Sequence, residues 1–272
     1  MKHKQKCPNC TDSPTRQVFI APAGGRIVQC FRCGLQFAED YPEIEAADIE
    51  IYGSDYFRAS LEEQERRMGI FDQFVAEVES IIGRKGRLLD VGCGEGTLLF
   101  AAVERGWKAE GTEIASVMVH HIREKFGLTV HQGVLEDLEL PLCSFDAIIM
   151  NHVLEHVSDP RITLEKIAEL LSPGGVVRIE VPNLASLSNR WKNFQSRFGL
   201  KKNLWKHYSP DHHFWFFTPR TLKATLEEAG LSPLMIIAPA KQCGGKSSID
   251  NLANALYRKT LWGGHLVAYA GI

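Results

Sequence analysis

The sequence predicts an α/β protein with a mainly parallel sheet and helices on both faces, preceded by a small cysteine-rich module. From residue 87 onward, strand-like and helix-like segments alternate along the chain. The first 38 residues instead carry two CxxC pairs, at 7–10 and 30–33. We therefore expect a module at 1–38, a linker at 39–60 and one large domain at 61–272.

Composition narrows the functional class. The chain has 272 residues, 44% of them hydrophobic, and a formal charge of −2. That is enough apolar material for a sizeable core, and the near-neutral charge gives no general reason to bind nucleic acid or an anionic membrane. We find no secretory signal and no membrane-spanning apolar run, and we read the basic start, MKHKQK, as a solvated tail. We therefore expect a cytoplasmic protein with reduced cysteines.

The two CxxC pairs predict a zinc ribbon. Two thiolates on one tight turn take two corners of a tetrahedron, and a second such turn supplies the other two. Each pair lies beside a short strand-like run, at 16–20 and 27–30. Two redox-active pairs are the alternative, but they lack the βα context that activates a thiolate. A closed site of four thiolates has a structural role, and its expected ligands are Cys7, Cys10, Cys30 and Cys33.

The segment at 39–57 is acidic and aromatic, and we expect Tyr52, Tyr56 and Phe57 to dock on the protein. The residues after it, 61–82, show helical periodicity. Their apolar stripe consists of Ile70, Phe71, Phe74, Val75, Val78, Ile81 and Ile82.

The body then alternates, which favours a parallel sheet that binds ligands at the carboxyl ends of its strands. Strands are expected at 87–91, 107–113, 128–133, 145–151, 176–183, 231–240 and 263–272. Helices are expected at 96–106, 115–126, 160–171, 218–230 and 249–260. Thr218 is the expected cap of the fourth helix, and the apolar C-terminus predicts a strand inserted into the sheet.

The stretch LLDVGCGEG at 88–96 predicts a nucleotide site. Gly92, Gly94 and Gly96 allow a sharp turn and a close approach of ligand to backbone. The spacing is G-x-G-x-G rather than G-x-G-x-x-G, so a purely structural turn is the alternative. Glu113 ends the next strand, 21 residues after Gly92. A carboxylate there can accept both hydroxyls of a ribose.

The motifs LLDVGCGEG, GTE, HQGVLEDL, SFDAIIMNHVLEHVSDP and LSPGG occur in this order. This series resembles the class I S-adenosylmethionine-dependent methyltransferases, closely over 80–182. The resemblance implies a Rossmann-like sheet of seven strands. The form VLEHVSDP is similar to small-molecule methyltransferases. The chain also carries the CxxC pairs, GLQF, YGSDYF and HHFWFFTPRTL. This combination resembles a bacterial subgroup that is associated with sugars, surface glycans or secondary metabolites. The core of that subgroup resembles the enzymes of ubiquinone O-methylation.

The resemblance implies roles at the glycine loop. Gly92 and Gly94 would lie against the methionine part of the cofactor, and Asp90 near its amino group. Glu113 would hold the ribose hydroxyls, and Ile114 would flank the adenine.

Two further loops are implied by the same resemblance. Val134 stands where the family often has an acid for the adenine amino group, so adenine recognition would rest on packing and on the backbone near Leu135. Asn151 and His152 would face the methionine moiety and the methyl group.

Methyl transfer to an oxygen or nitrogen that carries a proton needs a base, and histidine is the usual one. We select candidates from the VLEH motif and from the segment WKHYSPDHHFWFFTP: His156, His207, His212 and His213. Alternatively, His156 could serve to hold Glu155. The aromatic segment could alternatively close the hydrophobic core. A solvated or structural role is expected for His3, His120, His121, His131 and His265.

Glu155, His156 and Asp159 are close in sequence and could hold a metal, but their side chains can face different ways, so we do not assign a catalytic metal. The basic aromatic stretch at 189–207 is either a lid that attracts an anionic substrate or an amphipathic helix with a solvated basic face. Cys93, Cys143 and Cys243 are interpreted as small apolar residues.

The leading functional hypothesis is methyl transfer to a hydroxyl of a small molecule, such as a sugar, a glycan precursor or a secondary metabolite. An RNA methyltransferase that grips RNA with its zinc ribbon is the second hypothesis. A non-catalytic cofactor-binding adaptor is the third. The ribbon has only Arg16, Arg26 and Arg32 between residues 7 and 37, which disfavours RNA. The acceptor, the methylated atom and the oligomeric state stay open.

Overall fold

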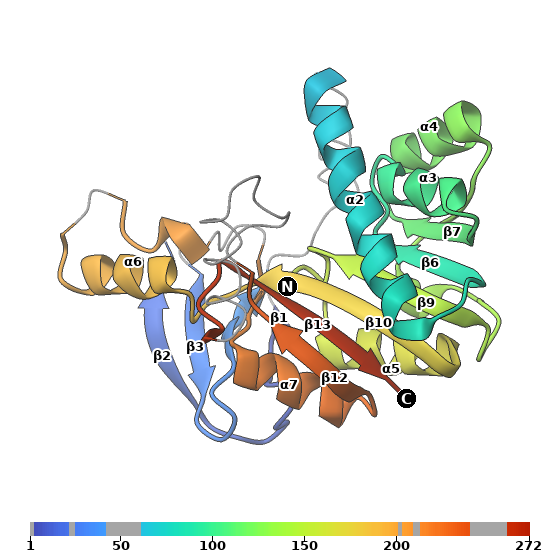
Figure 1. Cartoon of the computed structure of the whole chain (residues 1–272). Coiled ribbons are helices and arrows are strands. Elements are labelled where there is room, and N and C mark those ends of the chain that lie inside the picture. Colours follow the sequence, from blue (N-terminus) through green and yellow to red (C-terminus); the bar gives the residue numbers. More distant parts are fainter. Residues whose placement is uncertain (1–2, 22–24, 42–60, 201–202, 209–212, 240–259) are drawn as a thin grey trace. The chain divides into compact units, whose positions relative to one another are not determined.

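The structure is a computed structural model, and it describes residues 3–21, 25–41, 61–200, 203–208, 213–239 and 260–272 (Figure 1). The chain forms two compact units. One comprises Met1–Glu43, His152–Leu164 and Ile179–Tyr269, and the other comprises Ile44–Asn151, Glu165–Arg178 and Ala270–Ile272. The expected linker beyond residue 41, nearly all of the expected helix at 249–260, and Cys243 lie outside the described residues.

The main sheet has seven strands, as expected, and their order is β12-β13-β10-β9-β6-β7-β8. Its pairs β6–β7, β6–β9 and β7–β8 are parallel, and Figure 1 shows β6, β7 and β9 side by side. The strands are β6 (Arg87–Val91), β7 (Lys108–Glu113), β8 (Thr129–Gln132), β9 (Phe145–Asn151), β10 (Leu171–Pro182), β12 (Ser232–Ile237) and β13 (His265–Gly271). Central strands such as β9 are buried on both faces, which explains their continuous apolar runs.

The last strand confirms the expectation for the C-terminus. β13 lies between β12 and β10 rather than at an edge of the sheet. Its five residues 266–270 are all buried, on both faces. Because a polar side chain on either covered face would need a buried partner, a largely apolar sequence suits this strand.

Six described α-helices accompany the strands: α2 (Leu61–Ile82), α3 (Thr97–Glu104), α4 (Ser116–Phe126), α5 (Pro160–Leu170), α6 (Leu187–Arg197) and α7 (Pro219–Glu228). In α2, the centre of the predicted stripe is buried, whereas Ile81 is exposed. The buried guanidinium of Arg178 lies 3.5 Å from the ring centroid of Phe74 and 3.5 Å from a carboxylate oxygen of Glu77. This cation–π contact and ion pair anchor α2 within its unit.

The start of α7 matches its sequence signal. The Thr218 hydroxyl accepts a hydrogen bond from the Thr221 backbone N–H at 3.2 Å, and the Thr221 hydroxyl accepts one from the Thr218 N–H at 2.9 Å. This reciprocal pair satisfies two backbone donors, and Pro219 follows at the first helical position, where no donor is needed.

The cysteine-rich module forms a second sheet, in the order β11-β4-β3-β2. Its strands are β2 (Thr15–Ile20), β3 (Arg26–Cys30), β4 (Gln36–Ala38) and β11 (Trp215–Phe216), and β1 (His3–Lys4) pairs separately with β5 (Asp40–Tyr41). The pairing of β11 with β4 joins Trp215 to Phe37. The sequence does not predict β11, because two residues carry no periodic pattern.

The stretch at 189–207 contributes most of α6, a helix with exposed basic side chains, as the second interpretation expects, and with exposed aromatic side chains that it does not expect. The exposed side chains include Arg190 and Arg197, but also Trp191 and Phe194, whose rings stack at 5.6 Å. Ser196 is buried instead and accepts a hydrogen bond from the Trp205 backbone. Among the described helices, none is both long and apolar enough to cross a bilayer.

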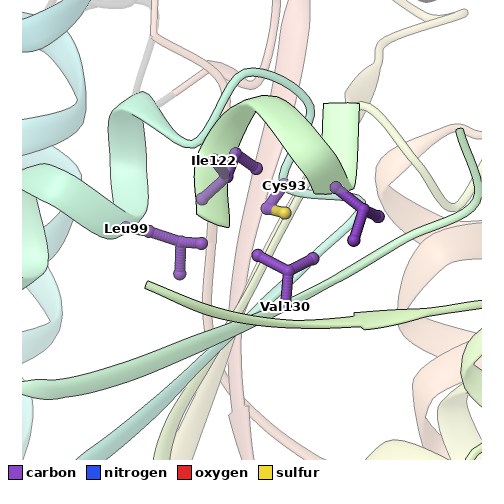
Figure 2. Close-up of a cluster of buried hydrophobic side chains, with 5 residues drawn as sticks. Cys93, Leu99, Ile122 and Val130 are labelled. Carbon is purple, nitrogen blue, oxygen red and sulfur yellow. The ribbon is translucent and has the colours of Figure 1, made fainter. Parts of the chain in front are cut away.

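The glycine loop after β6 is seated on a small apolar cluster, in which Cys93, Leu99, Ile122 and Val130 point toward one another (Figure 2). A Cβ at Gly111, on β7, would lie 2.7 Å from the Cys93 sulfur. Glycine is therefore needed at position 111 for the loop to approach β7 this closely. Cys93 is buried as expected, whereas Cys143 is exposed.

Candidate functional site

The four predicted metal ligands come together. The Sγ atoms of Cys7, Cys10, Cys30 and Cys33 all lie within 4.8 Å of one another. The Sγ atoms of Cys7 and Cys33 are 3.5 Å apart, close to the separation of about 3.8 Å that follows from Zn–S bonds of about 2.3 Å in a tetrahedron. Two turns present them: Cys10 N–H donates to the Cys7 carbonyl at 3.2 Å, and Gly34 N–H donates to the Cys30 carbonyl at 3.0 Å.

The thiols of this cluster influence one another's ionisation. The hydrogen bond with Cys7 lowers the pKa of Cys33 to about 5, and the same contact together with burial raises the pKa of Cys7. Burial raises the pKa of Cys10 to about 11. All four cysteines are free rather than disulfide-bonded. Four converging thiols with no intervening disulfide fit a tetrahedral metal ion that takes thiolate ligands.

The glycine loop leaves backbone open to a ligand. Gly92 and Gly94 both have positive φ, +69° and +53°. A Cβ at Gly94 would meet no atom of the described residues within 4 Å, so the space beside this backbone is open among them. Asp90, at the end of β6, is buried. Burial, together with the nearby Glu113 carboxylate, raises the pKa of Asp90 well above its usual range. A bound cation near Asp90 would offset the cost of burying the charged carboxylate.

Glu113 ends β7 and ties two loops together. Its Oε2 accepts the Gly94 N–H at 2.9 Å, and its Oε1 accepts the N–H groups of Ile114 at 2.9 Å and Ala115 at 3.0 Å. A carboxylate offers about four lone-pair positions, so these contacts leave room for at least one further donor. Ile114 is exposed beside it.

The loop after β8 carries the other expected adenine contacts. Val134 is exposed, and Leu135 is buried at the start of a short 3₁₀ helix, η1 (Leu135–Asp137). Asn151 is the last residue of β9, and its Oδ1 is buried without a hydrogen-bond partner within the described part of the chain. An orphaned acceptor of this kind fits a ligand that brings a donor. Open glycine backbone, a buried carboxyl and this amide together fit a nucleoside that carries an amino acid.

His152 follows β9 in a strained backbone conformation, with φ +55°. Its N–H donates to the Glu180 carbonyl at 2.9 Å. Its ring nitrogen Nδ1 lies 3.1 Å from Oε1 of Glu155. Its Nε2 lies 3.7 Å from Oε1 of Glu180. The ring of His265 stands at 82° to it, with the centroids 4.9 Å apart.

His156 and His213 form a second histidine pair beside Glu155. Their ring centroids are 4.9 Å apart, and His156 Nε2 lies 4.0 Å from Oε1 of Glu155. Glu155 itself is fully buried, and its backbone carbonyl accepts the Phe214 N–H at 2.8 Å. That bond holds the segment before α7 against the residues after β9. Both predicted histidines thus meet one carboxylate.

The other predicted residues lie elsewhere. His212 is outside the described residues, and for His207 only the backbone is described, in η2 (Lys206–Tyr208). Tyr208 is buried against Phe19, so it belongs to the core of the small sheet, as the alternative for the aromatic segment supposed. Asp159 accepts the backbone N–H of Arg161 at the start of α5 and does not join Glu155 and His156.

Two residues near His152 have no site role in the sequence analysis. Glu180 lies within the apolar run of β10, so the sequence gives it no role. His265 is expected from the sequence to be structural or solvated. A carboxylate within a strand that is buried on both faces is the signal that distinguishes Glu180, because such a group needs a partner.

Known proteins resemble this chain. A family model described as a methyltransferase domain matches residues 61–235. An enzyme of Dinoroseobacter shibae named ubiquinone biosynthesis O-methyltransferase is 30% identical over 62% of this chain and 70% of its own length. An enzyme of the same name from Cereibacter sphaeroides is 31% identical, and the match covers 54% of this chain and 61% of that enzyme.

A solved structure shows the fold independently. A SAM-dependent methyltransferase from Archaeoglobus fulgidus superimposes with a TM-score of 0.54 at 20% identity, over 81% of this chain and 98% of its own. The family model covers more than half of the chain, including β6 and the glycine loop. The chain therefore belongs to the methyltransferase-domain family and is a class I S-adenosylmethionine-dependent methyltransferase.

Proposed function

We propose that the enzyme transfers the methyl group to a hydroxyl of a small molecule, a sugar, glycan precursor or secondary metabolite, with a histidine of the 156–213 pair as base. One observation carries this proposal: His156 and His213 lie together beside the buried carboxylate of Glu155. An imidazole ordered by a carboxylate suits the removal of a hydroxyl proton near neutral pH.

The cofactor assignments are part of the proposal. Gly92 and Gly94 present open backbone to the methionine part, and Asp90 meets its amino group. Glu113 accepts the ribose hydroxyls, while Ile114 and the backbone at Val134 and Leu135 border the adenine. The open space at Gly94 and the buried carboxyl of Asp90 support these roles.

Asn151 and His152 are assigned to the methionine moiety and the methyl group. The orphaned Oδ1 of Asn151 supports an interaction with a ligand donor.

When bound, S-adenosylmethionine supplies a methyl group on a good leaving group, so positioning and proton removal are left to the chain. Glu155 holds its histidine neighbours in place from a fully buried position. His156 or His213 accepts the acceptor proton as the new bond forms. The hydrogen bond from the Phe214 N–H to the Glu155 backbone carbonyl fixes the main chain that carries this carboxylate.

The hydroxyl acceptor is supported by the relatives, which are named O-methyltransferases of ubiquinone biosynthesis. Their named substrate class is a small molecule. We extend the acceptor to sugars and glycan precursors on the strength of the subgroup resemblance. A cytoplasmic location follows from the need to keep the four cysteines reduced.

We also propose that Cys7, Cys10, Cys30 and Cys33 hold one structural zinc ion, within a module at 1–38 that a linker at 39–60 joins to the catalytic domain at 61–272. The convergence of the four sulfur atoms supports the zinc assignment.

The test is a methyl-uptake screen with labelled S-adenosylmethionine against nucleotide sugars, free sugars and catechol-type phenols. We expect one class to become labelled, and His156→Gln and His213→Gln to abolish the labelling of that class while S-adenosylhomocysteine still binds. Labelling that is equal in the wild type and both variants would overturn the assignment of the base.

A further inference from the structure

We propose that His152, Glu180 and His265 form a binding site for a divalent transition-metal ion, with Glu155 orienting His152 from behind. One ring nitrogen of each histidine and one carboxylate oxygen of Glu180 lie within 4.8 Å of one another. Two imidazoles and one carboxylate are a frequent ligand set for zinc and neighbouring metals. All four residues belong to the same compact unit.

The distances fit a metal with little movement. His152 Nε2 and Glu180 Oε1 are 3.7 Å apart. That separation is too long for a good hydrogen bond. Two ligand atoms on a tetrahedral ion with bonds of about 2.0–2.1 Å are about 3.4 Å apart. The gap between these two atoms therefore needs to close by only a few tenths of an ångström.

The other side of the His152 ring is prepared for this role. Nδ1 lies 3.1 Å from Oε1 of Glu155. A hydrogen on Nδ1 donates to that carboxylate and leaves the lone pair of a neutral ring on Nε2, facing Glu180. A carboxylate behind a ligating histidine is the usual arrangement at metal sites, where it fixes the tautomer and strengthens the ligand.

Two buried atoms give an independent reason for a cation. Nδ1 of His265 is buried without a hydrogen-bond partner among the described residues, and the same holds for Oε2 of Glu155. Glu155 and Glu180 are both fully buried carboxylates. Burying two such groups within reach of one imidazole is unfavourable, and a dication between His152, Glu180 and His265 would offset it.

The strained backbone of His152 points the same way. A histidine with φ +55° is uncommon, and strain of this kind is retained where the position of a side chain matters. The N–H of His152 is held by the Glu180 carbonyl, so the same two residues are joined by backbone and face each other through their side chains.

The test uses the full-length protein with one equivalent of zinc per chain, which fills the four-cysteine cluster and leaves no excess zinc for the proposed second site. The protein is equilibrated with Co²⁺, separated from free metal, and its cobalt content and absorption spectrum are measured. We expect about one added cobalt per chain without a thiolate charge-transfer band, and paramagnetically shifted imidazole protons. Wild-type protein that takes up no such cobalt would overturn the proposal, whatever the behaviour of the variants.

Variants then locate the ion. Glu180→Gln and His265→Gln should each weaken cobalt binding by about 100-fold or more, and Glu155→Gln by about 10–100-fold. The controls are His120→Gln, an exposed residue, and His213→Gln, from the second histidine pair. Both controls should keep the cobalt. Loss of cobalt in His213→Gln with retention in His265→Gln would place the ion at the second pair and contradict the proposal.

Discussion

The Gly94 backbone N–H donates a hydrogen bond of 2.9 Å to the Glu113 carboxylate. This bond links the glycine loop after β6 to the end of β7, two features whose sequence separation is typical of a nucleotide site. The carboxylate that is proposed to hold the ribose thus also shapes the loop that is proposed to receive the methionine part. Cofactor affinity and loop order are therefore expected to change together.

Replacement of Glu113 tests this link. Glu113→Ala removes the acceptor of three backbone N–H groups and the acceptor proposed for the ribose hydroxyls. At about 1.5–3 kcal/mol for each bond to a charged group, affinity for S-adenosylhomocysteine should fall by about 100-fold or more. Calorimetric titration measures it, with the exposed Glu139→Ala as control. Equal affinity in Glu113→Ala and wild type would reject the ribose assignment.

A pair of glycine substitutions separates cofactor contact from folding. Gly94→Ala adds a methyl group to open space at φ +53°, so it should destabilise the protein by only about 1–2 kcal/mol while strongly weakening cofactor binding. Gly96→Ala would bring its Cβ to 2.9 Å from Ile122 and should mainly destabilise the fold. Thermal unfolding and titration of both variants distinguish the two. If Gly94→Ala binds cofactor normally, the glycine loop does not contact the cofactor at Gly94.

The buried carboxyl of Asp90 should lower the stability of the cofactor-free protein in a pH-dependent way while it strengthens cofactor binding. Because burial raises its pKa in the folded state, its contribution to stability is fully present below its unfolded pKa and is lost as pH rises through the raised value. Asp90→Asn should therefore stabilise the cofactor-free protein by about 0.5–2 kcal/mol at neutral pH, with the advantage vanishing in acid. The same variant should bind S-adenosylmethionine more weakly. Denaturant unfolding across pH checks the first part, and a variant that is less stable at pH 7 would contradict it.

Removal of the cysteine ligands tests the zinc proposal. Cys7→Ser with Cys33→Ser should lower the zinc content by one equivalent and unfold the small sheet, because so small a module cannot bury enough core alone. Metal analysis and limited proteolysis report the two effects, with Cys143→Ser as the matched control, since this cysteine is exposed and outside the cluster. Wild-type protein that is purified without zinc and remains folded would exclude a structural metal.

The sequence predicts the main sheet well because its signals are local. Apolar runs mark β6 and β9, and the cap at Thr218 marks α7. The strand β11 escapes prediction because its partner β4 lies far away in the sequence and the pairing is a tertiary event. The helix α6 matches one of the two interpretations of its stretch, but the exposure of its aromatic residues depends on tertiary packing, which buries Ser196 instead.

The candidate site shows the same division. The glycine loop and Glu113 are recognisable because their spacing is fixed by one strand–helix–strand unit. The convergence of His156 with His213, and of His152 with Glu180 and His265, depends on how three distant segments pack. Closeness in sequence does not bring Asp159 to Glu155 and His156, because it accepts a backbone hydrogen bond at the start of α5.

The most direct test of the central claim is calorimetric titration of the folded, zinc-loaded protein with S-adenosylmethionine and S-adenosylhomocysteine. We predict that both bind, at one site per chain, and that Glu113→Ala weakens both. If the folded wild-type protein binds neither, the loop at 92–96 is only a turn or serves another nucleotide, and the assignment of this site as the methyl-donor site is contradicted.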